Sequence, residues 1–345
     1  MRSWRREPET PPPGDPATMA EVGRAAADAA PPPPGAHRHG DDVHPEAHAH
    51  PHVGPAYDGR PVIGIVGAGA VGTALGVALS RAGWQVGAVA SRDPERRARF
   101  RSLVPGARAF PEPAAILDQC HLALLAVPDD ALAGLARGLH LYSGQAIVHT
   151  SGLHDAAVLA PALAAGTSAG SFHPLVAFAD LDRALAALPG ATVAIEGDAA
   201  LLDLLAEMAA SLGAVPVRLA PDSKAAYHAA AVLAAGGLTA LLDVVAAVAA
   251  PTGLDEAGSL AVYGPLAAQA LANARALGIG PALTGPAARG DAGTIEAHLA
   301  ALGGAGEEAL DVYRALGRRQ VTLAERRGLA PEVVVRLRAA FTRSR

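Results

Sequence analysis

Lys224 and His228 form a pair whose residue types and spacing suit acid–base chemistry. They are four positions apart, so on a helix both side chains project from one face. They stand at the start of a long helix expected over residues 222–250, directly after the last expected strand. A lysine partly removed from water has a lowered pKa and can give up a proton during a reduction. The alternative is an exposed lysine with a core histidine one turn later.

Three further candidates lie where apolar, strand-like segments end. Ser151 and Gly152 follow the segment 145–150; Ser151 offers a hydroxyl, and Gly152 offers backbone without side-chain bulk. His173 ends the segment 170–173. Ligands of an open parallel sheet bind beyond the carboxyl ends of its strands, so we expect these residues to face a substrate. For His173, the alternative is a packed loop histidine.

Arg289 and Asp291 lie in a turn-rich segment, residues 284–291, between helical stretches. A guanidinium suits bidentate recognition of a carboxylate, so Arg289 is a candidate substrate ligand, with Asp291 beside it. The alternative is an interhelical loop with an Arg–Asp pair, in which Asp291 caps a helix over residues 294–302.

A glycine-rich turn is the strongest motif in the chain. It follows the apolar segment 62–66, opens a helix, and consists of Gly67, Ala68, Gly69, Ala70, Val71 and Gly72. Its first glycine permits a tight turn, its second lets the backbone approach a pyrophosphate, and its third lets the helix pack on its strand. The helix start then points free N–H groups at the phosphates. In this setting the pattern indicates a dinucleotide site.

Ser91 and Arg92, at the end of the second expected strand, indicate which dinucleotide binds. An acidic residue there favours NAD, whereas Arg92 can bind a 2′-phosphate, with Arg96 and Arg97 one turn further on. We therefore expect NADP(H). The rival ribose ligand is Asp93, but Asp93 precedes a proline and a glutamate and reads as a helix N-cap. Beyond the segment 122–127, Val127 and Pro128 are expected beside the nicotinamide, and Asp129 or Asp130 is expected to cap the next helix.

Strand-like and helical segments alternate as far as residue 220, which predicts a doubly wound, mainly parallel α/β sheet. The strand segments are 62–66, 84–90, 107–110, 122–127, 145–150, 170–173, 192–195 and 215–219. Beyond Pro221 only helical patterns follow. We therefore expect a nucleotide-binding domain over 59–220 and a helical substrate or dimerisation domain over 221–345.

The helix expected over 222–250 is apolar on most faces. Its uncharged run, Ala229 to Leu242, has 14 residues, fewer than the roughly 18 needed to span a membrane. We interpret it as a central buried helix that touches the nucleotide domain or a second subunit. Gly236 and Gly237 in its middle predict a kink or a close backbone approach.

Composition limits the classes of function. The chain has 345 residues, 51% of them hydrophobic, and a formal charge of −5, which gives no reason to expect nucleic acid or a membrane surface as a partner. With a single cysteine, Cys120, the chain cannot form an internal disulfide, which is typical of a cytoplasmic protein. We interpret Cys120 as a small buried residue. Residues 1–58 are rich in proline and histidine and predict a disordered tail, which is neither a secretory signal nor a scaffold for a metal site.

Several of these segments together resemble a known family. They are Leu124 to Asp129, His149 to Gly152, Phe172 to Leu175, Lys224 with Tyr227 to Ala231, and Thr284 to Pro286 with Ala288 to Asp291. From about 60 to 340 the chain resembles dehydrogenases with a Rossmann-like domain followed by an uncharacterised helical domain similar to the C-terminal domain of 6-phosphogluconate dehydrogenase. The wider group includes ketopantoate reductase and pyrroline-5-carboxylate reductase.

The resemblance implies roles for the candidates. Lys224 would be the proton donor, and His173, His228 and Arg289 would belong to the site of a homodimer formed through the helical domain. The implied activity is NADPH-dependent reduction of a small carboxylate-bearing carbonyl compound such as ketopantoate. Reduction of an imine and a non-catalytic NADP-binding sensor are the alternatives. The chain has Ala235-Gly236 where relatives have Ser-Asn, which favours the sensor.

Overall fold

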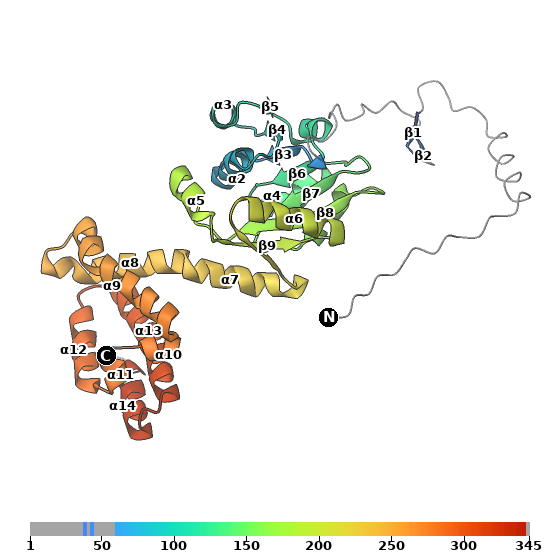
Figure 1. Ribbon diagram of the computed structural model, residues 1–345. Helices are drawn as coiled ribbons and strands as arrows, with labels where there is room; N and C mark the ends of the chain where they lie inside the picture. Colours follow the sequence, from blue (N-terminus) through green and yellow to red (C-terminus); the bar gives the residue numbers. More distant parts are fainter. Residues whose placement is uncertain (1–36, 40–41, 45–58, 343–345) are drawn as a thin grey trace, which may run out of the picture.

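The structure is a computed structural model that describes residues 37–39, 42–44 and 59–342. Most of the tail predicted over residues 1–58 lies outside these ranges; its described strands, β1 (His37–His39) and β2 (Asp42–His44), pair antiparallel. Figure 1 shows the remaining chain as a sheet covered by helices and a separate helical part, joined by one long helical segment.

One sheet contains eight strands in the order β10-β9-β8-β7-β6-β3-β4-β5. Their bounds are β3 Ile63–Val66, β4 Val86–Ala90, β5 Arg108–Phe110, β6 Leu122–Leu125, β7 Ala146–His149, β8 Ser168–Pro174, β9 Thr192–Glu196 and β10 Val215–Arg218. Neighbouring strands are parallel except β8 and β9. The predicted doubly wound fold is confirmed, and its strand order reverses between β3 and β6, where such sheets bind ligands.

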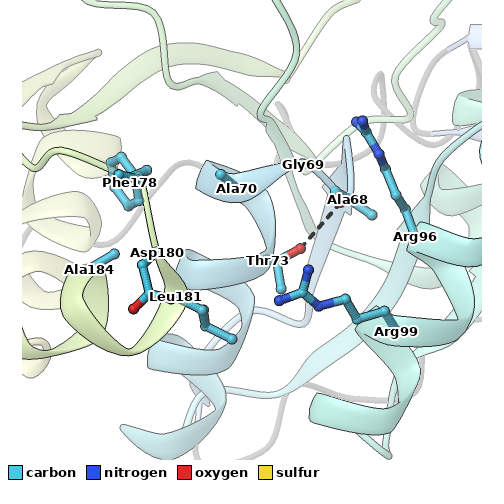
Figure 2. Close-up of a pocket in the computed structure, with 11 residues that line it drawn as sticks. Ala68, Gly69, Ala70, Thr73, Arg96, Arg99, Phe178, Asp180, Leu181 and Ala184 are labelled. Atoms are coloured by element: carbon cyan, nitrogen blue, oxygen red, sulfur yellow. Dashed lines mark hydrogen bonds between the residues drawn. The ribbon is translucent and has the colours of Figure 1, made fainter.

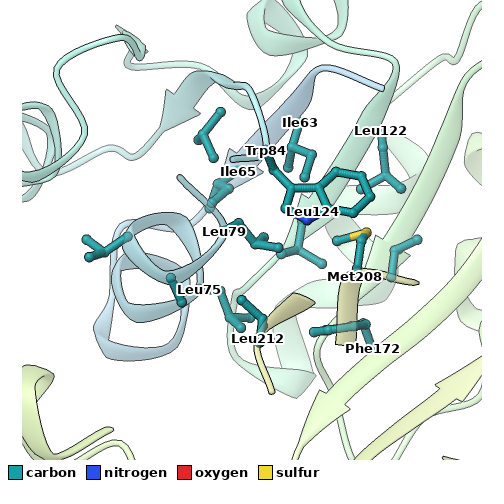
Figure 3. Close-up of a cluster of buried hydrophobic side chains, with 14 of the residues drawn as sticks. Ile63, Ile65, Leu75, Leu79, Trp84, Leu122, Leu124, Phe172, Met208 and Leu212 are labelled. Atoms are coloured by element: carbon teal, nitrogen blue, oxygen red, sulfur yellow. The ribbon is translucent and has the colours of Figure 1, made fainter. Parts of the chain in front are cut away.

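Helices pack on both faces of the sheet. They are α2 Ala70–Arg81, α3 Pro94–Leu103, η2 Pro113–Gln119, α4 Asp129–Arg137, η3 Ala156–Ala162, α5 Leu181–Ala187 and α6 Ala199–Ser211. On one face, Trp84 packs among aliphatic side chains and Met208, as Figure 3 shows, and its Nε1–H donates to Ser211 Oγ at 2.8 Å. On the other face, Cys120 is buried as predicted, and burial raises the pKa of its thiol to about 12.

Between β10 and residue 342, where the described chain ends, only helices follow. They are η4 Pro221–Ser223, α7 Lys224–Ala234, α8 Gly236–Ala249, η5 Ala250–Thr252, α9 Glu256–Leu277, α10 Ile279–Ala282, α11 Pro286–Arg289, α12 Ala292–Leu302, α13 Glu307–Arg326 and α14 Pro331–Thr342. A small core around Phe341 holds α11 to α14 together. The long helix is interrupted at Ala235, next to the predicted glycines, but α7 and α8 continue in one direction in Figure 1, so the interruption is not a marked kink.

The expectation that this long helix is buried is wrong for a single chain. The segment Lys224–Thr252 has 29 residues and a mean hydropathy of 2.1, and none of its most apolar window is buried. By length and composition alone it could cross a membrane. Leu233, for example, is 74% exposed. An apolar surface of this size needs other residues packed against it, but within one chain α8 packs mainly on α9 and α13, apart from its sequence neighbours α7 and η5.

Candidate functional site

The glycine-rich turn has the geometry that a dinucleotide requires. Gly67 has φ +102°, and a Cβ there would overlap the carbonyl oxygen of Ala126. A Cβ at Gly72 would overlap the carbonyl oxygen of Gly67. At Gly69, by contrast, no atom lies within 4 Å of the Cβ position. The space over Gly69 is therefore open to a phosphate, and α2 starts at Ala70 with its N–H groups free for it.

A cavity of about 300 Å³ opens beside this turn. In Figure 2, Arg96 and Arg99 of α3 lie on one side of the start of α2, and Phe178 and Asp180 lie on the other. The remaining lining residues are Ala68, Gly69, Ala70, Thr73, Ala179, Leu181 and Ala184. Arg96 Nε pairs with Asp93 Oδ2 at 3.2 Å, so the Arg99 guanidinium and the free backbone N–H groups are what make this cavity suited to an anion.

Ser91, Arg92 and Asp93, which the sequence places at the adenosine end of the coenzyme, lie between β4 and α3. Arg92 is exposed, and its carbonyl oxygen accepts a bond from Arg97 Nη1 at 3.1 Å. Arg97 also donates to the carbonyl oxygen of Ser91, so Arg97 holds this turn in place. Asp93 caps α3 as predicted, accepting from the N–H groups of Glu95 and Arg96 at 2.9 and 3.2 Å. Its carboxylate is therefore already used within α3.

Val127 and Pro128 lie on the other side of the turn. A Cβ at Gly67 would stand 3.3 Å from Val127 Cγ1. Pro128 precedes α4, whose first turn contains Asp129 and Asp130; neither aspartate caps the helix, because Pro128 is the N-cap residue. The two segments thus flank the glycine turn at the carboxyl ends of β3 and β6.

Ser151 lies in a turn that His149 orients. The Nδ1 atom of His149 accepts from the Ser151 N–H at 3.2 Å, so its Nε2–H donates to the carbonyl oxygen of Asp155 at 3.0 Å. Burial lowers the pKa of His149 to about 4, which keeps the ring neutral. Ser151 Oγ accepts from the N–H groups of Leu153 and His154, both at 3.1 Å. Its oxygen therefore shapes the turn.

His173, Tyr227 and His228 meet beside Gly152, and we call them the His173 cluster. The ring centroid of His173 lies 5.7 Å from that of Tyr227 and 5.7 Å from that of His228, both edge to face. A Cβ at Gly152 would overlap His228 Nδ1 and stand 2.8 Å from His173 Nε2. The cluster thus joins the ends of β7 and β8 to α7.

The polar atoms of the His173 cluster are buried without partners in the described part of the chain. They are His173 Nδ1, Tyr227 Oη and His228 Nδ1. A buried polar group without a partner is costly, so three in one place indicate a site for a polar ligand. Burial and the charges of His228 and Lys224 lower the pKa of His173 to about 4. Burial raises the pKa of Tyr227.

Lys224 lies in a buried network next to the cluster. Its Nζ donates to the carbonyl oxygen of His154 at 2.5 Å and to Ser171 Oγ at 2.7 Å, and it forms an ion pair with Glu196 Oε2 at 3.2 Å. Burial lowers the pKa of Lys224, as the sequence suggested, while the Glu196 carboxylate opposes this shift. Lys224 and His228 share one helix face as predicted, but only His228 reaches the cluster.

Arg289 and Asp291 are not brought to the His173 cluster within one chain. Arg289 ends α11, which packs on α12 and α13, and Figure 1 shows this region beyond α8 and away from the sheet. Asp291 caps α12, accepting from the Thr294 N–H at 3.1 Å and from Thr294 Oγ1 at 2.7 Å. Asp291 is therefore a helix cap, as the alternative interpretation of the sequence predicted. Arg289 is exposed.

Sequence reasoning did not assign Tyr227, Ser171 or Glu196 to the site. Tyr227 shares a helix face with Lys224 and His228, and this spacing could have identified it. Glu196 ends an apolar strand, which is a weak signal by itself. Its contact with Ser171 depends on the antiparallel pairing of β8 and β9.

Two family patterns match the chain. Residues 49–174 match the Rossmann-like domain, and residues 191–320 match a domain of unknown function, DUF2520. The chain therefore belongs to the proteins that combine a Rossmann-like domain with a DUF2520 helical domain. Among curated proteins, none matches the sequence.

Solved structures share the arrangement of both parts. A Bacteroides fragilis protein, provisionally assigned as an NADP oxidoreductase, is 24% identical, with a TM-score of 0.66 over 76% of this chain and 98% of its own. A 1-pyrroline-5-carboxylate reductase from Streptococcus pyogenes is 14% identical, with a TM-score of 0.54 over 81% and 99%. An Aspergillus terreus reductive aminase solved with NADPH is 16% identical, with a TM-score of 0.51 over 81% and 92%. At these identities the likeness establishes the fold.

Proposed function

We propose that this protein is an NADPH-dependent oxidoreductase that reduces a small carboxylate-bearing carbonyl compound, with a 2-keto acid such as ketopantoate as the first substrate to test. The observation that carries this proposal is the His173 cluster, whose three unpartnered polar atoms lie beside the carboxyl ends of the strands. A carbonyl oxygen that becomes an alkoxide needs hydrogen-bond and proton donors at such a place.

NADP(H) is the proposed coenzyme. The open backbone at Gly69 can accept the pyrophosphate, and Arg92, Arg96 and Arg99 supply positive charge at the neighbouring turn and cavity. Asp93, the acidic residue in the position that would favour NAD, is already occupied as a helix cap. When bound, NADPH supplies the hydride. The chain's own residues must then position the carbonyl group, exclude water and provide the proton.

Reduction of an imine is the second candidate, because the fold is shared with a pyrroline-5-carboxylate reductase and a reductive aminase. Both reactions consume one proton but at different points, because an imine can take its proton from solution before hydride transfer and bind as an iminium ion. Hydride addition to an iminium ion gives a neutral amine, whereas hydride addition to a carbonyl group gives an alkoxide that must be protonated. Three buried polar atoms at one point therefore favour the carbonyl substrate.

Purified protein mixed with NADPH and a panel of 2-keto acids and cyclic imines tests the proposal. Loss of absorbance at the reduced-nicotinamide band with a keto acid supports it, and turnover confined to imines replaces it with the second candidate. NADPH binding without turnover across the panel would support a non-catalytic sensor instead. Calorimetric titrations with NADPH and with NADH, measured separately, show which coenzyme the protein binds more tightly.

We also propose that two copies pair through the helical part, in a soluble protein of the cytoplasm. Large apolar side chains are exposed along α7, α8 and α9, namely Val232, Leu233, Leu238, Leu260, Val262, Leu266 and Leu271. An open apolar cavity of about 1060 Å³ is lined by residues of α7, α8, α9 and α13. Asp243 and Glu308 line the same cavity, which argues against lipid as its cover. A second copy would cover this surface and could bring its Arg289 to the substrate carboxylate.

A further inference from the structure

The buried ammonium group of Lys224 has no donor left for a substrate. A lysine ammonium carries three N–H donors. Here it has three acceptors, the His154 carbonyl oxygen, Ser171 Oγ and Glu196 Oε2, at 2.5, 2.7 and 3.2 Å. The Lys224 side chain is 3% exposed and that of Glu196 is 17% exposed. To reach a substrate, the lysine would have to leave a buried carboxylate unpaired, which is costly.

The same network fixes the face that α7 presents to the sheet domain. Lys224, Tyr227, His228 and Ala231 are the shielded residues of the first two turns, and their spacing of three and four places them on one helix face. The intervening alanines, such as Ala225 and Ala229, are exposed. Lys224 lies at the start of this stripe, so its three bonds hold the next turn, with Tyr227 and His228, against Gly152 and His173.

Within the cluster, Tyr227 carries a proton that it can give away. Burial raises its pKa, so its hydroxyl is protonated throughout the neutral range. His173 is neutral there, because its pKa is lowered to about 4, and a neutral imidazole is a far weaker acid than a phenol. Tyr227 Oη also has no partner among the described residues, so its proton is not committed to another protein group.

We propose that Tyr227 donates the proton in the reduction and that Lys224, paired with Glu196, is a positioning residue. This inference rests on the proposed carbonyl reductase function. Hydride from NADPH adds to the carbonyl carbon, and the electron pair of the C=O π bond moves to the oxygen. The resulting alkoxide takes the proton of Tyr227 Oη, which leaves a tyrosinate that regains a proton from water. His173, whose ring packs against those of both Tyr227 and His228, holds the ring of Tyr227 in place.

Four variants test the proposal in steady-state assays of the full chain, with NADPH affinity measured separately by titration. They are Tyr227→Phe, the matched control Tyr263→Phe on α9, His228→Asn, and the charge-neutral double variant Lys224→Met/Glu196→Gln. We expect Tyr227→Phe to lower kcat on the keto acid about 10²- to 10⁴-fold, as loss of a general acid does, with NADPH affinity unchanged. Tyr263→Phe should match the wild type.

The double variant separates positioning from chemistry. It should keep kcat within about tenfold of the wild type, show its loss mainly in KM, and retain the wild-type pH profile of kcat. A wild-type rate in Tyr227→Phe, a kcat that falls further in His228→Asn than in Tyr227→Phe, or an altered pH profile of kcat in the double variant overturns the inference. A wild-type protein that reduces no keto acid overturns the proposed function, and the inference with it.

Discussion

Gly152 and His228 touch across the boundary between the sheet domain and the long helical segment. A Cβ at position 152 would occupy the place of His228 Nδ1 and would also crowd the ring of His173. Gly152 follows β7, whereas His228 lies in the second turn of α7, so their contact sets how closely the two parts approach. The absence of a side chain at 152 is what allows the His173 cluster to form.

Gly152→Ala is expected to impair turnover by displacing both histidine rings. A misplacement of about 1 Å in a catalytic geometry costs on the order of 10²-fold in rate, and kcat/KM should fall by about that factor. Gly134→Ala, on the exposed face of α4, has nothing but Arg137 nearby at 3.9 Å and serves as the control. Full activity in Gly152→Ala would show that the cluster does not contribute to turnover.

The Lys224–Glu196 pair is expected to matter for stability when one partner is removed. Lys224→Met leaves the partly buried Glu196 carboxylate without its cation and should lower the free energy of unfolding by about 3 kcal/mol, the lower end of the cost for a fully buried pair. Adding Glu196→Gln should restore part of that loss. The exposed Arg218–Asp203 pair is the control, and Arg218→Ala should cost less than about 1 kcal/mol. Equal losses in the single and double variants, measured by denaturant unfolding, would contradict this account.

The fold and the glycine-rich turn could be predicted from the sequence because their signals are local. An apolar strand, the glycines from Gly67 to Gly72 and a helix start are contiguous, and their geometry needs no distant residue. The same is true of Asp93, whose cap on α3 follows from the proline and glutamate beside it. Alternation of strands and helices then predicts the layered sheet.

The candidate site depends on contacts that the sequence does not encode locally. Tyr227 and His173 meet only because α7 leaves the sheet next to β8, and Glu196 reaches Lys224 only because β9 runs antiparallel to β8. The helix over 222–250 is not buried within one chain, for a related reason. Apolar periodicity indicates that a surface needs a cover but does not say whether the same chain provides it.

His149 is expected to make stability depend on pH in mildly acidic solution. Its pKa is about 4 in the folded protein, below the value of about 6.5 for an unfolded histidine, so the unfolded chain binds the extra proton more readily. Stability is therefore full above about pH 6.5 and falls as the pH decreases towards 4, by about 3 kcal/mol from this residue. His149→Gln should reduce this fall by about half, because His173, whose pKa is also lowered to about 4, contributes a similar fall over the same range. His140→Gln, at an exposed position, should leave it unchanged.

Exposed leucines of the long helical segment are expected to hold two copies together. Leu233→Asp should shift the mass measured by light scattering from dimer to monomer, because it adds a carboxylate to a largely apolar surface at a position that is 74% exposed in one chain. Val335→Asp is the control, since Val335 is 66% exposed but lies on α14, outside that surface. A wild-type protein that is monomeric at micromolar concentration would exclude the proposed pairing.

Arg99, which no motif of the sequence singles out, is expected to contribute to NADPH binding. Its side chain reaches the cavity beside Thr73, as Figure 2 shows, whereas Arg101 on the same helix does not line it. A charge-assisted hydrogen bond is worth about 1.5 to 3 kcal/mol, so Arg99→Ala should weaken NADPH binding roughly 10- to 100-fold, and Arg101→Ala should leave it unchanged. Titration of each variant with NADPH and NADH also identifies the phosphate that is bound. A loss with NADPH alone places the 2′-phosphate at Arg99, an equal loss with both coenzymes places the pyrophosphate there, and no loss with either removes Arg99 from the coenzyme site.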